Sequence, residues 1–174
     1  MGYFGIVVSN LAVRRAGEYD ALAIAAVLRQ AFAEFEPKYT AAAFAATTPD
    51  VAMVLERLRE GPVWVAVHDD QIVGTVAVVS REQECYIRGM GVLPGARARG
   101  AGRQLLAAVE AFALESGAER IFLSTTPFLH RAIQLYERNG FRRTPQGPHD
   151  LWGTPLFTMV LFRQLKLLMI VVWL

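Results

Sequence analysis

Residues 92–106 read Val-Leu-Pro-Gly-Ala-Arg-Ala-Arg-Gly-Ala-Gly-Arg-Gln-Leu-Leu, and this stretch decides the fold. It lies between a β-rich run and a run with helical periodicity, with small residues at the join. The first N–H groups of a helix have no partner within the helix, and the helix dipole favours an anion beside them. Glycine lets the backbone approach phosphate oxygens, and Arg97, Arg99 and Arg103 can add charge-assisted bonds. The stretch therefore predicts a phosphate-binding loop.

Other phosphate-binding motifs fit this stretch less well. A P-loop requires Gly-Lys-Ser/Thr, and residues 92–106 contain no lysine. A dinucleotide-binding fingerprint requires a third glycine where Leu105 stands. The remaining alternative is an ordinary glycine-containing loop between a strand and a helix.

Two sequence blocks carry a family resemblance. Arg97-x-x-Gly100-x-Gly102 resembles the Gln/Arg-x-x-Gly-x-Gly/Ala signature of the GNAT family of N-acetyltransferases. Residues 132–141, Ala-Ile-Gln-Leu-Tyr-Glu-Arg-Asn-Gly-Phe, resemble the A-x-x-L-Y-x-x-x-G-F segment on that family's last helix. The blocks have the family's order and approximate separation, and the resemblance covers roughly residues 11–162.

The resemblance implies an α/β fold with a mixed central sheet, splayed at the cofactor site and covered by helices on both faces. Acetyl-CoA, as cosubstrate, would lie where two parallel strands separate, with its pyrophosphate on the loop. The implied cofactor-binding residues are Met90, Gly91, Val92, Arg97, Arg99, Gly100, Ala101, Gly102 and Arg103.

The implied reaction is direct transfer of an acetyl group from acetyl-CoA to a primary amine in a ternary complex, aided by proximity. The resemblance makes Tyr136 the general acid for the CoA thiolate, whereas helical spacing alone would make it a core aromatic. Glu84 is the first choice for a general base, with Glu82 and His68 as other candidates and a solvated carboxylate as the alternative. A non-catalytic acyl-CoA-binding sensor or partner protein with the same fold stays open as a second function.

One position departs from the family pattern, and two other kinds of site are not expected. Leu129 stands where many family members carry an asparagine that contacts the pantetheine arm. Cys85 lies in an apolar strand without a neighbouring histidine, which favours a buried structural cysteine over a nucleophile. The three histidines have no metal-ligand spacing, so no metal is expected.

Periodicity outlines the rest of the chain. Gly89 and Gly91 interrupt the expected strand at 85–92, which predicts a bulge or the close approach of another molecule. The other expected strands are 11–15, 63–68 and 72–80 as a hairpin, 120–124 and 154–162. Four helices are expected. The first carries the apolar positions 24–35, and the second begins at Thr48-Pro49-Asp50 and ends at Gly61. The third runs from Gly102 to near Gly117, and the fourth spans 132–139.

The composition suits one domain over residues 1–174, with 53% hydrophobic and 20% charged residues. A net charge of +2 with scattered basic residues argues against a nucleic-acid binder. One cysteine excludes an internal disulfide and fits a reducing, cytoplasmic setting. The apolar tail 165–174 is too short to span a bilayer, so it is expected to pack on the domain or on a second subunit as a homodimer. The amine acceptor, a small molecule or a peptide, stays open.

Overall fold

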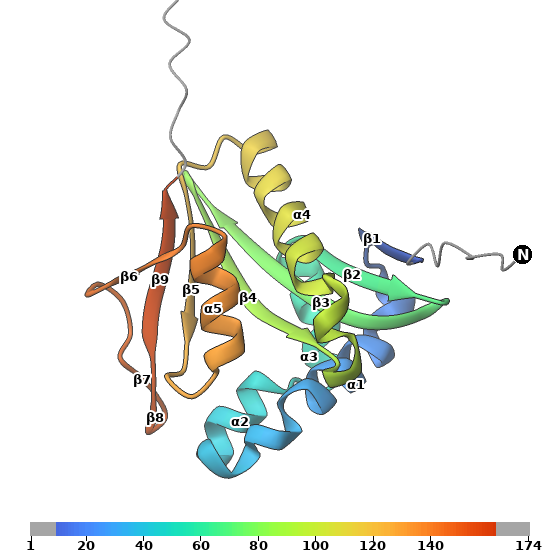
Figure 1. The fold of residues 1–174 in the computed structure, drawn as a ribbon, viewed down its shortest axis with the longest axis horizontal. Helices are drawn as coiled ribbons and strands as arrows, with labels where there is room; N and C mark the ends of the chain where they lie inside the picture. Colours follow the sequence, from blue (N-terminus) through green and yellow to red (C-terminus); the bar gives the residue numbers. More distant parts are fainter. Residues whose placement is uncertain (1–9, 163–174) are drawn as a thin grey trace, which may run out of the picture.

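A computed structural model describes residues 10–162 of the chain. Its centre is a seven-stranded mixed sheet, in which β4 and β5 are parallel neighbours and the other neighbouring pairs run antiparallel (Figure 1). Across the sheet the order is β1 (Leu11–Arg15), β2 (Val63–His68), β3 (Gln71–Arg81), β4 (Glu84–Val92), β5 (Arg120–Thr125), β9 (Phe157–Phe162) and β6 (Arg142–Thr144). The short strands β7 (Asp150–Leu151) and β8 (Thr154–Pro155) form a separate ribbon.

Helices cover both faces of the sheet. The α-helices are α1 (Ala21–Phe32), α2 (Ala41–Thr47), α3 (Val51–Glu60), α4 (Ala101–Glu115) and α5 (His130–Arg138), and the 3₁₀ helices are η1 (Glu18–Asp20), η2 (Ala33–Lys38) and η3 (Pro94–Arg99). α4 and α5 lie on one face, and α1 and α3 on the other (Figure 1). Each face has its own buried apolar cluster, one containing Leu105 and Ile133, the other Leu28 and Val54. The α/β class with helices on both faces is therefore confirmed.

The sheet opens between its two parallel strands. β4 pairs with β5 only where Glu84–Ile87 lie opposite Arg120–Leu123. Beyond that point β4 continues along β3 as far as Val92, whereas β5 continues along β9 as far as Thr125. The two strands separate after Ile87 and Leu123, and from there the edge of β4 that faces β5 has no strand partner. The family resemblance implied such a splay between two parallel strands.

A β-bulge marks the start of this opening. Ile87 pairs with Val78 and Met90 with Val76, so Arg88 and Gly89 together lie opposite one residue of β3. Gly89 has φ of 81°, a conformation that glycine adopts without steric cost. Side chains three positions apart on a regular strand point to opposite faces, but the extra residue of the bulge puts Ile87 and Met90 on the same face. Both side chains therefore pack in the cluster under α4 and α5.

The other interrupting glycine, Gly91, allows α1 to lie close to the sheet. A Cβ at Gly91 would stand 3.0 Å from Leu28 Cδ2 and 3.2 Å from the Cβ of Ala31. The sequence predicted a bulge or a close approach in this strand. Gly89 provides the bulge, and at Gly91 the close neighbour is a helix of the same chain.

The structure corrects several predicted boundaries. α1 ends at Phe32 and continues as η2, which contains Pro37. α3 begins after Asp50, whose carboxylate caps the helix by accepting from Met53 N at 2.8 Å, so Pro49 lies before the cap and not in the first turn. The predicted strand 154–162 is two strands, because the chain leaves the ribbon at Leu156 before β9 begins.

Residues 165–174, for which packing on the domain or a partner was expected, lie outside the described residues. Within residues 10–162, every helix is too short or too polar to cross a bilayer.

Candidate active site

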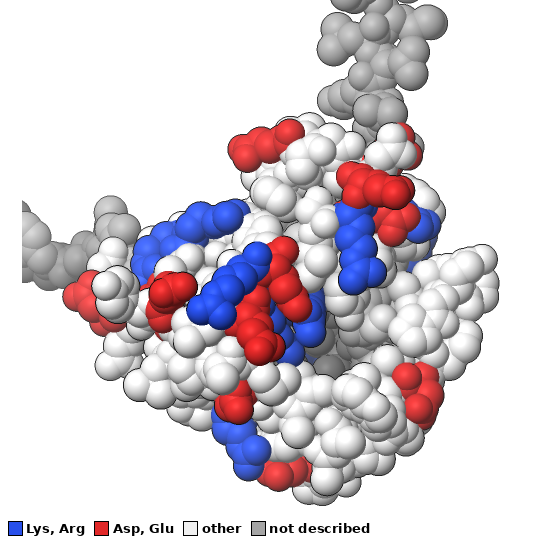
Figure 2. Space-filling view, turned by 180° about the vertical axis from the view of Figure 1, so that it is seen from behind, with Lys and Arg blue, Asp and Glu red and all other residues white. Residues whose placement is uncertain are grey.

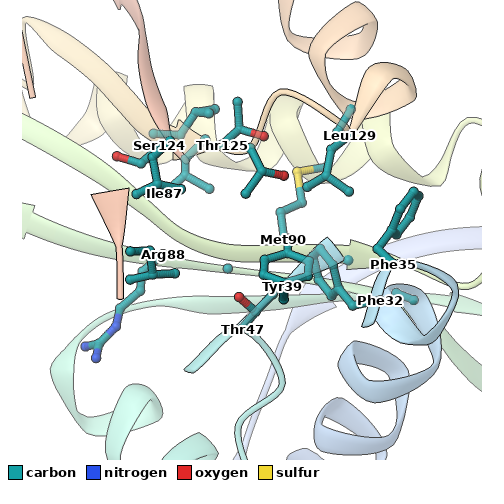
Figure 3. A pocket seen from close by; sticks show the side chains of 18 of the residues that line it. Phe32, Phe35, Tyr39, Thr47, Ile87, Arg88, Met90, Ser124, Thr125 and Leu129 are labelled. Atoms are coloured by element: carbon teal, nitrogen blue, oxygen red, sulfur yellow. The ribbon is translucent and has the colours of Figure 1, made fainter. Parts of the chain in front are cut away.

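A cavity of about 710 Å³ opens where β4 and β5 separate. Both strands line it, together with the C-terminal end of α1, one face of α3 and the first turns of α5. Met90 reaches from β4 toward Thr125 and Leu129, whereas Arg88 points the opposite way (Figure 3). The cavity therefore has two sides, one toward α5 and one toward α3, which meet at the bulge.

The predicted phosphate loop enters α4 beside this cavity. η3 is followed by Gly100 with φ of 82°, and the first bond of α4 runs from Gln104 N to Gly100 O at 3.0 Å. α4 itself offers no partner to the N–H groups of its first residues, Ala101 to Arg103. These groups and the helix dipole favour an anion at this end of the helix. Binding of a phosphate here stays a prediction.

The two glycines of the loop have different structural roles. A Cβ on Gly100 would meet no heavy atom within 4 Å, so its backbone angle is what favours glycine. A Cβ on Gly102 would stand 2.9 Å from Leu135 Cδ2 of α5. Gly102 therefore lets the Leu135 side chain of α5 pack directly on the first turn of α4.

The three arginines of the loop differ as well. Arg97 is tied to the protein itself: it donates to Ala31 O at 2.8 Å and to Val92 O at 3.3 Å, and it is paired with Glu34. It joins the end of α1 to the end of β4, and it also lines the cavity. Arg99 lies 2.8 Å from a ring nitrogen of His68. Arg103 is exposed on α4.

Tyr136 extends from α5 into the cavity and is 7% exposed. Its hydroxyl donates to the sulfur of Met90 at 3.8 Å. Burial, and then the nearby phenol of Tyr39, raise the pKa of Tyr136 well above its usual range. The hydroxyl therefore keeps its proton at neutral pH, in the form that a general acid requires.

The structure does not bring Glu84 to this place. Glu84 begins β4 at the end opposite the opening, where its carboxylate pairs with Arg120. Gly89 lies five positions further along the strand, a distance of about 16 Å. Glu82 lies in the turn beyond it, and His68 contacts the phosphate loop. The choice of Glu84 as general base stays a prediction, now without support from its position.

The turn before α5 differs from the expected pantetheine contact. Leu129 takes the N-cap position, lines the cavity and gives α5 no side-chain cap. The hydroxyl of the preceding Thr126 is buried next to the phenol of Tyr39. A ligand that passes this turn would find an apolar wall and one buried hydroxyl.

Aromatic residues in and next to η2, which follows α1, form one wall of the cavity together with Phe128. Phe35 stacks on Phe128 with ring centroids 6.2 Å apart, and Tyr39 meets Phe128 edge-on at 5.0 Å. The β7–β8 ribbon closes the wall, because Thr40 donates to the carbonyl of Trp152 at 2.8 Å. Segments far apart in sequence thus form one pocket.

Sequence reasoning missed Arg57 of α3, which lines the cavity. Its Nη2 donates to Ala46 O at 2.9 Å, and its Nε is buried without a partner. A charge on an amphipathic helix usually indicates a solvated face, so the sequence contains no signal that distinguishes Arg57 from the exposed Arg59.

Cys85 is fully buried, as expected for a structural cysteine, with its sulfur 3.9 Å from the Ser116 hydroxyl. Among residues 10–162, no three side chains of histidine, cysteine, aspartate or glutamate gather as metal ligands would.

Comparison with known proteins identifies the family that this chain resembles. Residues 23–141 match the model of the acetyltransferase (GNAT) family. The uncharacterised N-acetyltransferase YjgM of Escherichia coli (strain K12) is 31% identical over 139 residues, which cover 74% of this chain and 80% of that protein.

Two solved structures share the fold. The PaiA N-acetyltransferase of Thermoplasma acidophilum in complex with coenzyme A has a TM-score of 0.76 at 13% identity, covering 88% of this chain and 99% of that one. The putative acetyltransferase YncA of Salmonella typhimurium with acetyl-CoA has a TM-score of 0.68 at 23% identity, covering 88% of this chain and 94% of that one.

Proposed function

Because the chain belongs to the acetyltransferase (GNAT) family, we propose that it transfers an acetyl group from acetyl-CoA to a primary amine, with both substrates bound together. The observation that carries this proposal is the position of Tyr136. Its buried, protonated hydroxyl faces a sulfur atom at the open edge of β4. A hydroxyl held in this place can protonate the sulfur of a departing thiolate.

The residues at the opening fit acetyl-CoA. The pyrophosphate would lie on the N–H groups at the start of α4, beyond Gly100. The pantetheine arm would run along Met90, Gly91 and Val92, where the edge of β4 has backbone groups without a strand partner. One of these N–H groups would polarise the thioester carbonyl, a contact commonly worth about 3 kcal/mol in the transition state.

The transfer forms a bond between the amine nitrogen and the acetyl carbon, and it breaks the bond from that carbon to sulfur. The amine gives up one proton, and the thiolate takes one from Tyr136, which regains it from water. Glu34 is the one carboxylate among the described residues that line the cavity, and it is paired with Arg97. We therefore propose that the proton of the amine leaves to water, without Glu84 as base.

The first test is calorimetric titration with acetyl-CoA. Gly100→Glu places a carboxylate at the phosphate loop, and Gly117→Glu is its matched control. Both glycines have positive φ, 82° and 71°, and a Cβ on either would meet open space, but Gly117 follows the far end of α4. Binding that survives in Gly117→Glu and is lost in Gly100→Glu supports the site. A folded wild type that binds no acetyl-CoA overturns the proposal.

Release of free CoA in the presence of primary amines then separates an enzyme from a non-catalytic acyl-CoA-binding protein. Turnover with at least one amine is expected. Tight acetyl-CoA binding without turnover across a broad amine panel would favour the binding protein.

A further inference from the structure

Arg57 brings an uncompensated positive charge to the α3 side of the cavity. A guanidinium has five N–H donors, and the bond from Nη2 to Ala46 O uses one of them. Its Nε is enclosed without a partner, and no carboxylate of residues 10–162 forms an ion pair with it. A buried donor without an acceptor is costly unless a ligand provides one.

The groups around Arg57 do not neutralise it. The neighbouring Arg88 pairs with Glu60, so the three groups together keep one positive charge. Burial, and then the charge of Arg88, lower the pKa of Arg57. Acidic and basic side chains stand side by side across the molecular face that contains α3, next to a hollow (Figure 2). The one uncompensated positive charge, on Arg57, repels polycationic acceptors and attracts an anionic group.

Arg57 also lies next to the reacting centre. A Cβ built on Gly89 would stand 2.9 Å from its Nη1, so the guanidinium lies on the backbone of the bulge. The next residue, Met90, contacts the Tyr136 hydroxyl from the other face of the sheet. An anion on Arg57 and the acetyl-transfer point would thus lie on opposite sides of the same strand, at the neighbouring residues Gly89 and Met90.

We propose that the acceptor is a small amine that carries a carboxylate, such as a free amino acid, and that Arg57 binds this carboxylate. The inference rests on the proposed acetyl transfer and names its substrate class. The planar guanidinium matches a carboxylate with two parallel hydrogen bonds. With the carboxylate held at the bulge, an amine a few bonds away reaches the opening between β4 and β5. Met53, one turn before Arg57 on α3, gives the acceptor an apolar neighbour.

The test measures CoA release with the twenty common amino acids, each beside its primary amide, and with spermidine. The wild type is expected to favour the acid over the amide about 100-fold in kcat/KM for its best acceptor, the scale of one lost hydrogen bond between charged groups. Arg57→Gln should reduce this preference to about threefold or less, and Arg57→Lys should give an intermediate value because lysine keeps the charge without the planar fork. Arg59→Gln removes the same charge from an exposed position of α3 and should keep the preference.

Acetyl-CoA calorimetry on each variant separates the possible failures. Unchanged acetyl-CoA binding by Arg57→Gln shows that this variant is folded. If Arg57→Gln does not fold, Arg57→Lys is used in its place. A wild type without acetyl-CoA binding overturns both proposals. A wild type that binds acetyl-CoA but acetylates the amides or spermidine as well as the acids, or acetylates none of the amino acids, overturns the carboxylate proposal alone.

Discussion

The hydroxyl of Tyr136 donates to the sulfur of Met90 at 3.8 Å, across the opening between α5 and β4. A thioether is a weak acceptor, whereas a thiolate forms a short, charge-assisted bond. The same hydroxyl would therefore interact more strongly with the sulfur of a departing CoA than with its resting partner. Stronger interaction with the departing group than with the ground state is the condition for catalysis.

Tyr136→Phe tests this role. We expect kcat to fall about 100-fold or more, the usual scale for a lost general acid, with acetyl-CoA affinity within about threefold of wild type. Stability should change little, because the hydroxyl gives up only a bond to a thioether. Steady-state kinetics, calorimetry and thermal unfolding check the three parts. An unchanged kcat would remove Tyr136 from the mechanism.

The pH profile gives an independent check. Tyr136 acts in its protonated form, which persists below its pKa, and burial raises that pKa above the ordinary value of about 10. The plateau of kcat should therefore extend to at least about pH 10, and the rise at lower pH should follow deprotonation of the acceptor amine. A decline of kcat beginning near pH 8 would indicate that another group provides the proton.

Substitutions at Gly100 should act through the backbone. Gly100→Ala has room for its Cβ but must keep a left-handed conformation, so it should lower the free energy of unfolding by about 1–2 kcal/mol. Gly100→Asn should cost less, because asparagine tolerates this conformation better. Urea unfolding compares the two variants. Equal losses would mean that φ at this position is not the limiting factor.

Arg97 should act mainly as a structural link. Arg97→Ala removes bonds to two backbone carbonyls on separate elements, and we expect a loss of about 1.5–3 kcal/mol in the free energy of unfolding. Glu34→Gln leaves those bonds intact and should cost less than about 1 kcal/mol. If Arg97→Ala kept full stability and yet lost acetyl-CoA binding, the side chain would be a direct phosphate ligand instead.

Asp50 should stabilise the helix that carries Arg57. Asp50→Ala removes the side-chain cap of α3 and should lower the free energy of unfolding by about 1 kcal/mol, whereas Asp50→Asn should keep most of the stability. The midpoints of denaturant unfolding measure both changes, compared at equal slopes of the free energy of unfolding against denaturant concentration. A neutral Asp50→Ala would mean that water replaces the cap.

The sequence allowed the main elements and the phosphate loop to be predicted, because both depend on local patterns. Helical periodicity located α1, α4 and α5, and the glycines of β4 indicated the irregular strand. α2 was missed because its sequence, Ala-Ala-Ala-Phe-Ala-Ala-Thr, has one large apolar residue and no period to read. β6 and β7 are too short for a β pattern, and β8 was predicted as the start of one strand with β9.

The chemistry of the cavity was harder to predict, because it depends on contacts between distant segments. Glu84 and Met90 belong to the same strand, and only the point where β5 diverges shows which end of that strand faces the cavity. Arg57 and Arg59 look alike in sequence, and tertiary packing alone leaves one of them enclosed with an unpaired Nε. Local patterns were enough to predict a cofactor loop, whereas Arg57 could be recognised only in the folded chain.

The bulge at Arg88 and Gly89 also determines which kind of genetic change this site tolerates. Removing one residue there would restore regular pairing with β3 and leave Met90 and Gly91 on their present faces, because Ile87 and Met90 already lie in register with Val78 and Val76. Removing Gly91 instead would bring Val92 into its place, where a Cβ would stand 3.0 Å from Leu28 of α1. A single-codon deletion is therefore tolerated better at the bulge than in the strand beyond it. The bulge is the part of β4 whose length descendants of this chain are free to change, whereas the length of the strand beyond it is constrained.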